Sequence, residues 1–253
     1  MILMLLKLPP PEKIREDKGF RGFTLAEVLV TLGIIGVVSA MTVPSLMQNH
    51  QRKTYVTQLH KVYTEVQQAS LQYMADKNAI NLREAGLTNS GKMKEFLNGY
   101  FKVVNDCGSQ IKQPCFAESY RNLNGTSTPS NNANWGESSS VTLASGASIL
   151  IDAPDTYSKT VDGVTSYYGH MLIDINGLQG PNIGGRDMFQ AEFYDDGSID
   201  VVVATPGCKT KGACEGGSLK EIRETYYNSN CQKHAFGLGC FGKILNDNWE
   251  MNY

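Results

Sequence analysis

The chain has 253 residues, of which 41% are hydrophobic and 19% are charged, and its formal net charge at pH 7 is −2. This length is enough for a membrane anchor and one good core, and the lack of a basic excess gives no indication of nucleic-acid binding. The motifs G-x-S-x-G, H-E-x-x-H and G-x-x-x-x-G-K-[ST] do not occur in the sequence. The sequence therefore gives no support to the enzyme classes that these motifs mark.

Residues 23–47 form an apolar stretch that is long enough to span a membrane. As a helix with a rise of 1.5 Å per residue it measures about 37 Å, compared with about 30 Å for the hydrocarbon core of a bilayer. The apolar core of a secretory signal has only about 7 to 15 residues. Basic residues precede the stretch, so the positive-inside tendency predicts a cytoplasmic N-terminus and an extracytoplasmic C-terminal part. They are Lys7, Lys13, Arg15, Lys18 and Arg21.

One carboxylate, Glu27, lies near the start of this stretch, and no Lys, Arg or His occurs between Phe23 and Gln48. A charged side chain in a bilayer is costly, so we expect it to have a partner. Cleavage after Gly22 would give Phe23 a free amino group that could pair with Glu27 of a neighbouring chain. A plain membrane anchor would explain the length of the stretch but gives the carboxylate no role.

The residues K-G-F-R-G at 18–22, then F-T-L-A-E at 23–27 and the aliphatic run, resemble the N-terminal signature of type IV pilins and type II secretion pseudopilins. In that family a peptidase cuts after the glycine, the new terminal Phe is methylated, and the acid is needed for assembly. The resemblance assigns these roles to Gly22, Phe23 and Glu27. The leader 1–22 is long and begins with an apolar run, so it is either atypical or starts from a misassigned codon.

The resemblance also implies partners and a location. The partners are other pilin or pseudopilin subunits, prepilin peptidase, an inner-membrane assembly platform and membrane lipid, with no cofactor. The protein would lie in the bacterial inner membrane and then in a periplasmic or surface filament.

Beyond the membrane, the helix is expected to continue through residues 48–74, because apolar residues recur there at steps of three and four. Pro44 removes one backbone hydrogen bond, so a kink or local unwinding is expected near it. The resulting division is a leader (1–22), an assembly helix (23–47), an amphipathic continuation (48–74) and a globular part (75–253). The periodic apolar residues are Tyr55, Val56, Leu59, Val62, Tyr63, Val66, Ala69 and Tyr73.

The globular part is expected to contain a short helix, an exposed loop and an antiparallel sheet. The helix begins near Ser90 as N-cap and extends to Phe101. Residues 121–140 are rich in Asn, Ser and Gly and predict an exposed loop. The fold class is therefore α+β, with a long N-terminal helix packed on a C-terminal sheet, which the resemblance also implies. The predicted strands are 141–143, 147–151, 167–175, 188–194 and 198–204, with turns at 144–146 and 195–197.

The six cysteines all follow the apolar stretch, and their even number indicates up to three disulfides in an oxidising compartment. Cys107 and Cys115 are the favoured first pair because the loop between them is short. For the other four, Cys208 with Cys214 and Cys231 with Cys240 are favoured, although three connectivities are possible. No C-x-x-C pair occurs, and the four histidines do not stand at zinc-ligand spacing from the cysteines.

Residues 174–187 contain oxygen-bearing side chains beside glycines, which is the chemistry that Ca²⁺ prefers. Asp174, Asn176 and Asp187 are the candidate ligands. The spacing is not that of an EF-hand loop, and Asx residues beside Gly and Pro are also typical of tight turns. We interpret this loop as structural first and as a possible calcium site second.

Three classes of function remain. The favoured one is a structural subunit of a type IV pilus-like or type II secretion filament. The alternative is a minor pilin whose residues 208–253 act as an adhesive or ligand-binding tip module, and the third is a membrane-anchored secreted enzyme. An anchored enzyme should tolerate the loss of Glu27, whereas a filament subunit should not.

Overall fold

The computed structural model describes residues 22–129, 138–201, 205, 207–208, 214, 217–234 and 236–253. It divides into two compact units, Met1–Met47 and Gln48–Tyr253. The leader residues 1–21, the predicted strand residues 202–204 and part of the predicted loop lie outside the described residues.

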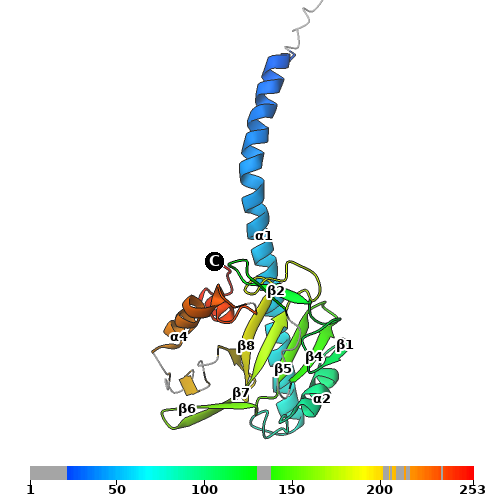
Figure 1. Cartoon of the computed structure of the whole chain (residues 1–253), viewed down its shortest axis with the longest axis vertical. Coiled ribbons are helices and arrows are strands. Elements are labelled where there is room, and N and C mark those ends of the chain that lie inside the picture. The colour runs from blue at the N-terminus through cyan, green and yellow to red at the C-terminus, as the bar shows by residue number, and fades with distance from the viewer. Residues whose placement is uncertain are drawn as a thin grey trace, which may run out of the picture. The chain divides into compact units, whose positions relative to one another are not determined.

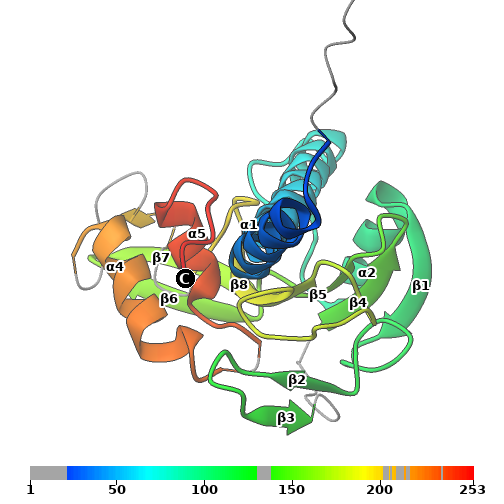
Figure 2. The ribbon, with the colours of Figure 1, turned by 90° about the horizontal axis from the view of Figure 1, so that it is seen from above.

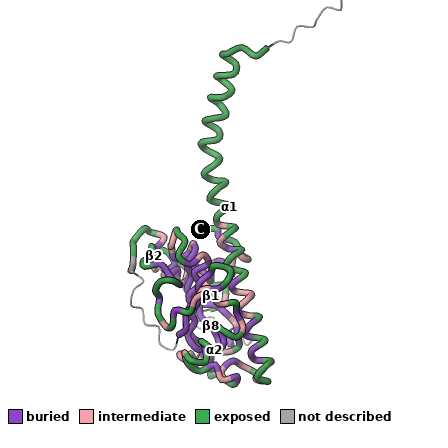
Figure 3. The backbone as a smooth tube through the Cα atoms, turned by 90° about the vertical axis from the view of Figure 1, so that its right-hand side faces the viewer, coloured by how far each residue is buried: buried purple, intermediate pink, exposed green. Residues whose placement is uncertain are grey.

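The first unit contains the beginning of helix α1, which as a whole extends from Leu25 to Asp76 and contains Pro44. Every described residue before Gln48 is exposed, as Figure 3 shows in green. By length and composition α1 is long and apolar enough to cross a membrane, with a mean hydropathy of 2.0 in its most apolar window. The helix is not interrupted at Pro44. Of the two alternatives, local unwinding is therefore wrong, because a proline removes a single hydrogen bond while the bonds on either side continue the helix, and the kink stays a prediction.

The second unit is a seven-stranded sheet with the remainder of α1 packed against one of its faces (Figures 1 and 2). The strand order is β1-β4-β5-β7-β8-β9, β6 pairs with the first half of β7, and every pairing is antiparallel. The predicted α+β class is thereby confirmed. The strands are β1 (Val103–Gly108), β4 (Ser138–Leu143), β5 (Ser148–Asp152), β6 (Tyr157–Val161), β7 (Val164–Asp174), β8 (Met188–Tyr194) and β9 (Ile199–Asp200).

The core lies between the sheet and the helices. Leu59 and Val66 of α1 are fully buried against Ile149 and Phe189 of the sheet. Helix α2 (Ser90–Tyr100) and helix α5 (Cys240–Asn246) extend the same core on either side of α1 (Figure 2). Helix α4 (Leu219–Tyr226) continues into a π-helical turn, η1 (Tyr227–Cys231), which leads back toward α5.

The N-cap of α2 differs by one residue from the prediction. Asn89 has an extended backbone, and its side-chain oxygen accepts the backbone N–H of Lys92 at 3.0 Å. Ser90 is the first helical residue instead of the cap. An Asn oxygen satisfies one of the free N–H groups of the first turn as well as a Ser oxygen does.

The predicted loop at 121–140 is wrong at both ends. Strands β2 (Ser119–Arg121) and β3 (Ser127–Pro129) form a small hairpin, and residues 138–140 are a buried part of β4. Ser138 and Ser140 donate their hydroxyl protons to the backbone carbonyls of Ser109 and Gln110. Polar side chains with such partners can be buried, so the composition of the segment was misleading.

Three disulfides join Cys107 to Cys115, Cys208 to Cys214 and Cys231 to Cys240. Their Cα atoms lie 6.3, 4.4 and 4.9 Å apart. These are the three pairs that the sequence favoured. Two of the bridges fall in the part of the chain after the sheet, where Cys240 begins α5 and Cys231 ends η1.

Candidate functional site: the amino-terminal segment

Gly22 and Phe23 precede helix α1, and Phe23 is 87% exposed. The helix begins at Leu25, directly after Thr24. Glu27 accepts two hydrogen bonds from Thr24, one from its backbone N–H and one from its hydroxyl, each at 2.8 Å. In return the Thr24 hydroxyl oxygen accepts the backbone N–H of Glu27 at 3.2 Å. This reciprocal arrangement is a capping box, which satisfies two of the free N–H groups of the first turn.

The capping box gives Glu27 a structural role that the sequence analysis did not include. The signal was present, because Thr24 followed three residues later by Glu27 matches the pattern [ST]-x-x-[DE] before an apolar run. A plain anchor would also benefit from a capped helix start, so the presence of Glu27 alone does not separate an anchor from an assembly helix. The charge of Glu27 and its capping oxygen must therefore be tested separately.

Between the capping box and Met47, the surface of α1 is almost wholly apolar. Its large hydrophobic side chains between Phe23 and Met47 are 41% to 87% exposed. Gly33 and Gly36 have no atom within 4 Å of the position that a Cβ would occupy, so a neighbouring helix can approach closely there. An exposed apolar surface of this extent requires lipid or another protein to cover it.

The loop 174–187, where calcium was considered, is held by hydrogen bonds within the protein. Asp174 accepts the hydroxyl proton of Tyr120 and the backbone N–H of Asn176. Asp187 accepts the backbone N–H groups of Asn182 and Ile183 at 2.7 and 2.6 Å. Both carboxyl groups are fully buried.

Burial raises the pKa of Asp174 to about 8, and the nearby charge of Asp187 adds to this rise. A protonated carboxyl is a poor ligand for Ca²⁺. Within the described residues, no group of three or more His, Cys, Asp or Glu side chains is placed to hold a metal ion. These contacts favour the structural interpretation of the loop, and the calcium hypothesis stays untested.

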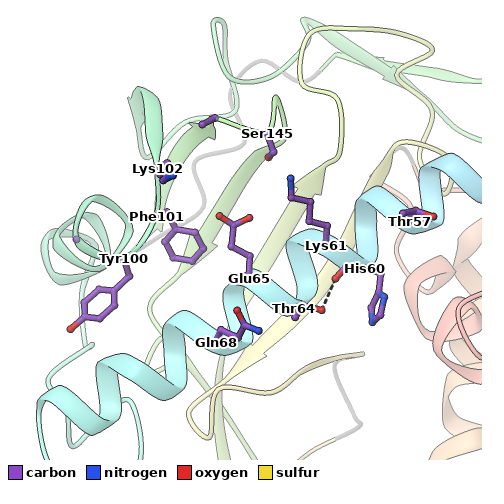
Figure 4. A pocket seen from close by; sticks show the side chains of 12 residues that line it. Thr57, His60, Lys61, Thr64, Glu65, Gln68, Tyr100, Phe101, Lys102 and Ser145 are labelled. Carbon is purple, nitrogen blue, oxygen red and sulfur yellow. Dashed lines mark hydrogen bonds between the residues drawn. The ribbon is translucent and has the colours of Figure 1, made fainter.

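The second unit has an open groove of about 940 Å³ beside α1, shown in Figure 4. Its walls come from α1, from the end of α2 and the two residues after it, and from the turn between β4 and β5. The hydroxyls of Thr57 and Thr64 donate to the backbone carbonyls of Lys53 and His60, so both are used within the helix.

Residues 17–43 match the family model described as the prokaryotic N-terminal methylation motif. This is the prepilin signature of type IV pilins and pseudopilins, and the match includes Gly22, Phe23 and Glu27. This segment therefore carries the N-terminal signature of type IV pilin and pseudopilin precursors, and helix α1 is long and apolar enough to anchor the chain in a membrane. No curated protein and no solved structure matches the chain.

Proposed function

We propose that this chain is a structural subunit of a type IV pilus-like or type II secretion filament. Prepilin peptidase cuts it between Gly22 and Phe23 on the cytoplasmic side of the inner membrane. The mature subunit then enters a filament through α1, and the sheet unit lies outside the helical bundle.

The observation that carries this proposal is the combination of an exposed apolar helix with a single acid near its start. In the membrane, lipid covers the side chains of residues 25–47. In a filament, the same side chains pack against the helices of neighbouring subunits, and Gly33 and Gly36 allow close approach. Glu27 then loses its contact with water, and the amino group of Phe23 on a neighbouring subunit provides the opposite charge.

The sheet unit supports the same role. Its core and its three disulfides make it a stable body, as a subunit outside the cytoplasm requires. The large groove beside α1 has no paired nucleophile and base among the described side chains that line it. A display or scaffolding role therefore fits this unit better than catalysis.

Two measurements test the proposal. Mass spectrometry of the mature protein should find an N-terminal Phe23 that carries one additional methyl group. Filaments sheared from the cell surface, or isolated from the periplasm, should contain the protein on immunoblots. A chain that is cleaved at Gly22 but is found only in the membrane fraction would refute the filament role and leave a processed membrane anchor.

A further inference from the structure

Three arginines from distant parts of the sequence lie around two adjoining hollows of the second unit. Arg52 is on α1, Arg121 is on β2, and Arg186 is on the loop between β7 and β8. Arg52 and Arg186 line a hollow of about 330 Å³, and Arg121 and Arg186 line one of about 300 Å³. Ile183 and Arg186 line both hollows, so the two hollows lie next to each other on either side of Arg186.

The backbone around Arg186 is held firmly. The buried Asp187 carboxylate accepts the N–H groups of Asn182 and Ile183, which fixes the turn that presents Arg186. This turn is also joined to β2, because the backbone N–H of Arg121 donates to the Asn182 carbonyl at 2.9 Å and the backbone carbonyl of Arg121 accepts the N–H of Gly184 at 2.8 Å. The positions of Arg121 and Arg186 are therefore set by the same network.

The charges of these arginines are not neutralised by carboxylates. None of the ion pairs among the described residues involves Arg52, Arg121 or Arg186. The half-buried Arg186 guanidinium instead donates to the sulfur of Met251 at 3.5 Å. Burial lowers the pKa of Arg186, and the positive charge of Arg52 lowers it further.

Two acids near the hollows, Asp187 and Glu250, accept hydrogen bonds from groups other than the arginines. The Asp187 carboxylate is engaged by backbone N–H groups. Glu250, which lines a third hollow together with Arg52, accepts a hydrogen bond from Asn252 at 3.2 Å. Two guanidinium groups that repel each other across a hollow create a site that an anion would stabilise.

The position of Arg52 along the chain indicates which anion this is. Arg52 follows Met47, the end of the apolar stretch, by five residues, and it follows Leu25, the first residue of α1, by 27 residues, about 40 Å of helical rise. A bilayer including its headgroups is about 40–45 Å thick. Arg52 therefore reaches the level of the outer headgroups when Leu25 is at the inner surface.

Two further features fit a lipid headgroup. Tyr55 lines the hollow with Arg52 and Arg186, and the ring of Tyr253 lies 5.8 Å from the Arg186 guanidinium. Tyrosines are enriched at the level of the headgroups. Basic residues directly after the outward end of a span run against the positive-inside tendency, so Arg52 needs a specific partner.

We propose that Arg52, Arg121 and Arg186 bind the headgroup phosphate of an anionic phospholipid in the outer leaflet of the inner membrane. Arginine forks match the oxygens of a phosphate in a bidentate manner, which a lysine cannot do. This binding holds the sheet unit at the membrane surface before assembly. This lipid binding is a property separate from filament formation and does not require it.

The test is native mass spectrometry of the mature full-length chain in a neutral detergent, with added phosphatidylglycerol or phosphatidylcholine. We expect the wild-type chain to bind phosphatidylglycerol more tightly than phosphatidylcholine. Arg52→Gln and Arg186→Gln should each weaken phosphatidylglycerol binding about tenfold, as expected for the loss of one charge-assisted contact. Arg52→Lys, which keeps the charge but not the fork, should show an intermediate loss.

Lys53→Gln is the matched control, since Lys53 is adjacent to Arg52 but does not line either of the two hollows that contain Arg186. This variant should bind phosphatidylglycerol with an affinity within about twofold of the wild-type value. Arg52 makes no hydrogen bond or ion pair within the described part of the chain, so its substitution should spare the fold even if Arg186→Gln does not.

Equal binding of the two lipids, or an equal loss in Lys53→Gln and Arg52→Gln, would overturn the proposal. Addition of inorganic phosphate tests whether the ligand is a soluble phosphate instead of a lipid headgroup. If inorganic phosphate binds to the full chain and displaces the lipid completely, the ligand is a soluble phosphate and the membrane assignment is wrong.

Discussion

The buried Asp174 leads to a sharp prediction about stability and pH. Its carboxyl group is fully buried, accepts the Tyr120 hydroxyl proton, and has a pKa raised by burial to about 8. An unfolded chain releases this proton near pH 3.9. Between about pH 4 and pH 8 the native state therefore holds a proton that the unfolded state lacks, and the free energy of unfolding falls as the pH rises.

The size of the effect follows from linkage. One proton changes the free energy of unfolding by about 1.4 kcal/mol per pH unit, which gives about 2–3 kcal/mol between roughly pH 5.5 and 7.5. Asp174→Asn removes this titration while an amide oxygen remains to accept the N–H of Asn176. The variant should therefore gain stability relative to the wild type as the pH rises.

The assay is urea unfolding of the mature chain in neutral detergent, followed by far-UV circular dichroism at several pH values. Glu192 and Asp195 also have raised pKa values, but they are present in both proteins and cancel in the difference. Asp106→Asn is the control: its pKa is lowered by a hydrogen bond from Lys94, so it should keep the wild-type dependence in this range. Parallel curves for the wild type and Asp174→Asn would refute the reasoning.

Three further predictions concern the second unit. Leu59→Ala removes a fully buried side chain from the contact between α1 and the sheet, and urea unfolding should show a loss of about 2–5 kcal/mol. The double variant Cys231→Ser, Cys240→Ser should lose about 2–3 kcal/mol in the same assay, because it frees a short loop in the unfolded chain; an unchanged midpoint would contradict this. Added Ca²⁺ should leave the melting temperature unchanged, because protein donors occupy Asp174 and Asp187; a clear rise would restore the calcium hypothesis.

The elements that the sequence predicted well have strong periodic patterns. Helix α1 was expected through residue 74 and ends at Asp76, and the strand 188–194 agrees with β8. Other strands were displaced by a few residues: 167–175 is Val164–Asp174 in the structure, and 147–151 is Ser148–Asp152. Strand ends depend on the partner strand, which a local pattern does not contain.

The missed elements depend on contacts between distant residues. Strand β6 has an exposed, polar sequence and exists because it pairs with β7 from Tyr157 to Val161. Ser138 and Ser140 at the start of β4 can be buried because the carbonyls of residues 109 and 110 accept their hydroxyl protons. Neither arrangement has a hydrophobic pattern from which to predict it.

The N-terminal segment could be recognised from the sequence, whereas the cluster of three arginines could not. The residues at 22–27 are contiguous, so the sequence alone was enough to propose roles for them, although the capping bond between Thr24 and Glu27 was overlooked. Arg52, Arg121 and Arg186 are each separated by more than 60 residues. The pairing of Arg121 with the loop at Ile183 brings Arg121 and Arg186 together, and this pairing has no local signal in the sequence.

The central claim is that the charge of Glu27, rather than its capping oxygen, governs entry into a filament. Two variants separate these roles. Glu27→Gln removes the charge but keeps an oxygen that can complete the capping box, since Gln serves at this position as well as Glu. Thr24→Ala removes the capping box and keeps the charge.

The most direct measurement is the amount of each variant in isolated filaments, relative to the amount in the membrane fraction, from cells that express one form at a time. Mass spectrometry should first verify that both variants are cleaved before Phe23. We predict that Glu27→Gln is reduced at least tenfold in filaments, because the amino group of Phe23 on the neighbouring subunit has lost its partner. Thr24→Ala should remain near the parental level. Parental incorporation of Glu27→Gln, or an equal loss in both variants, would contradict the claim that charge pairing governs assembly.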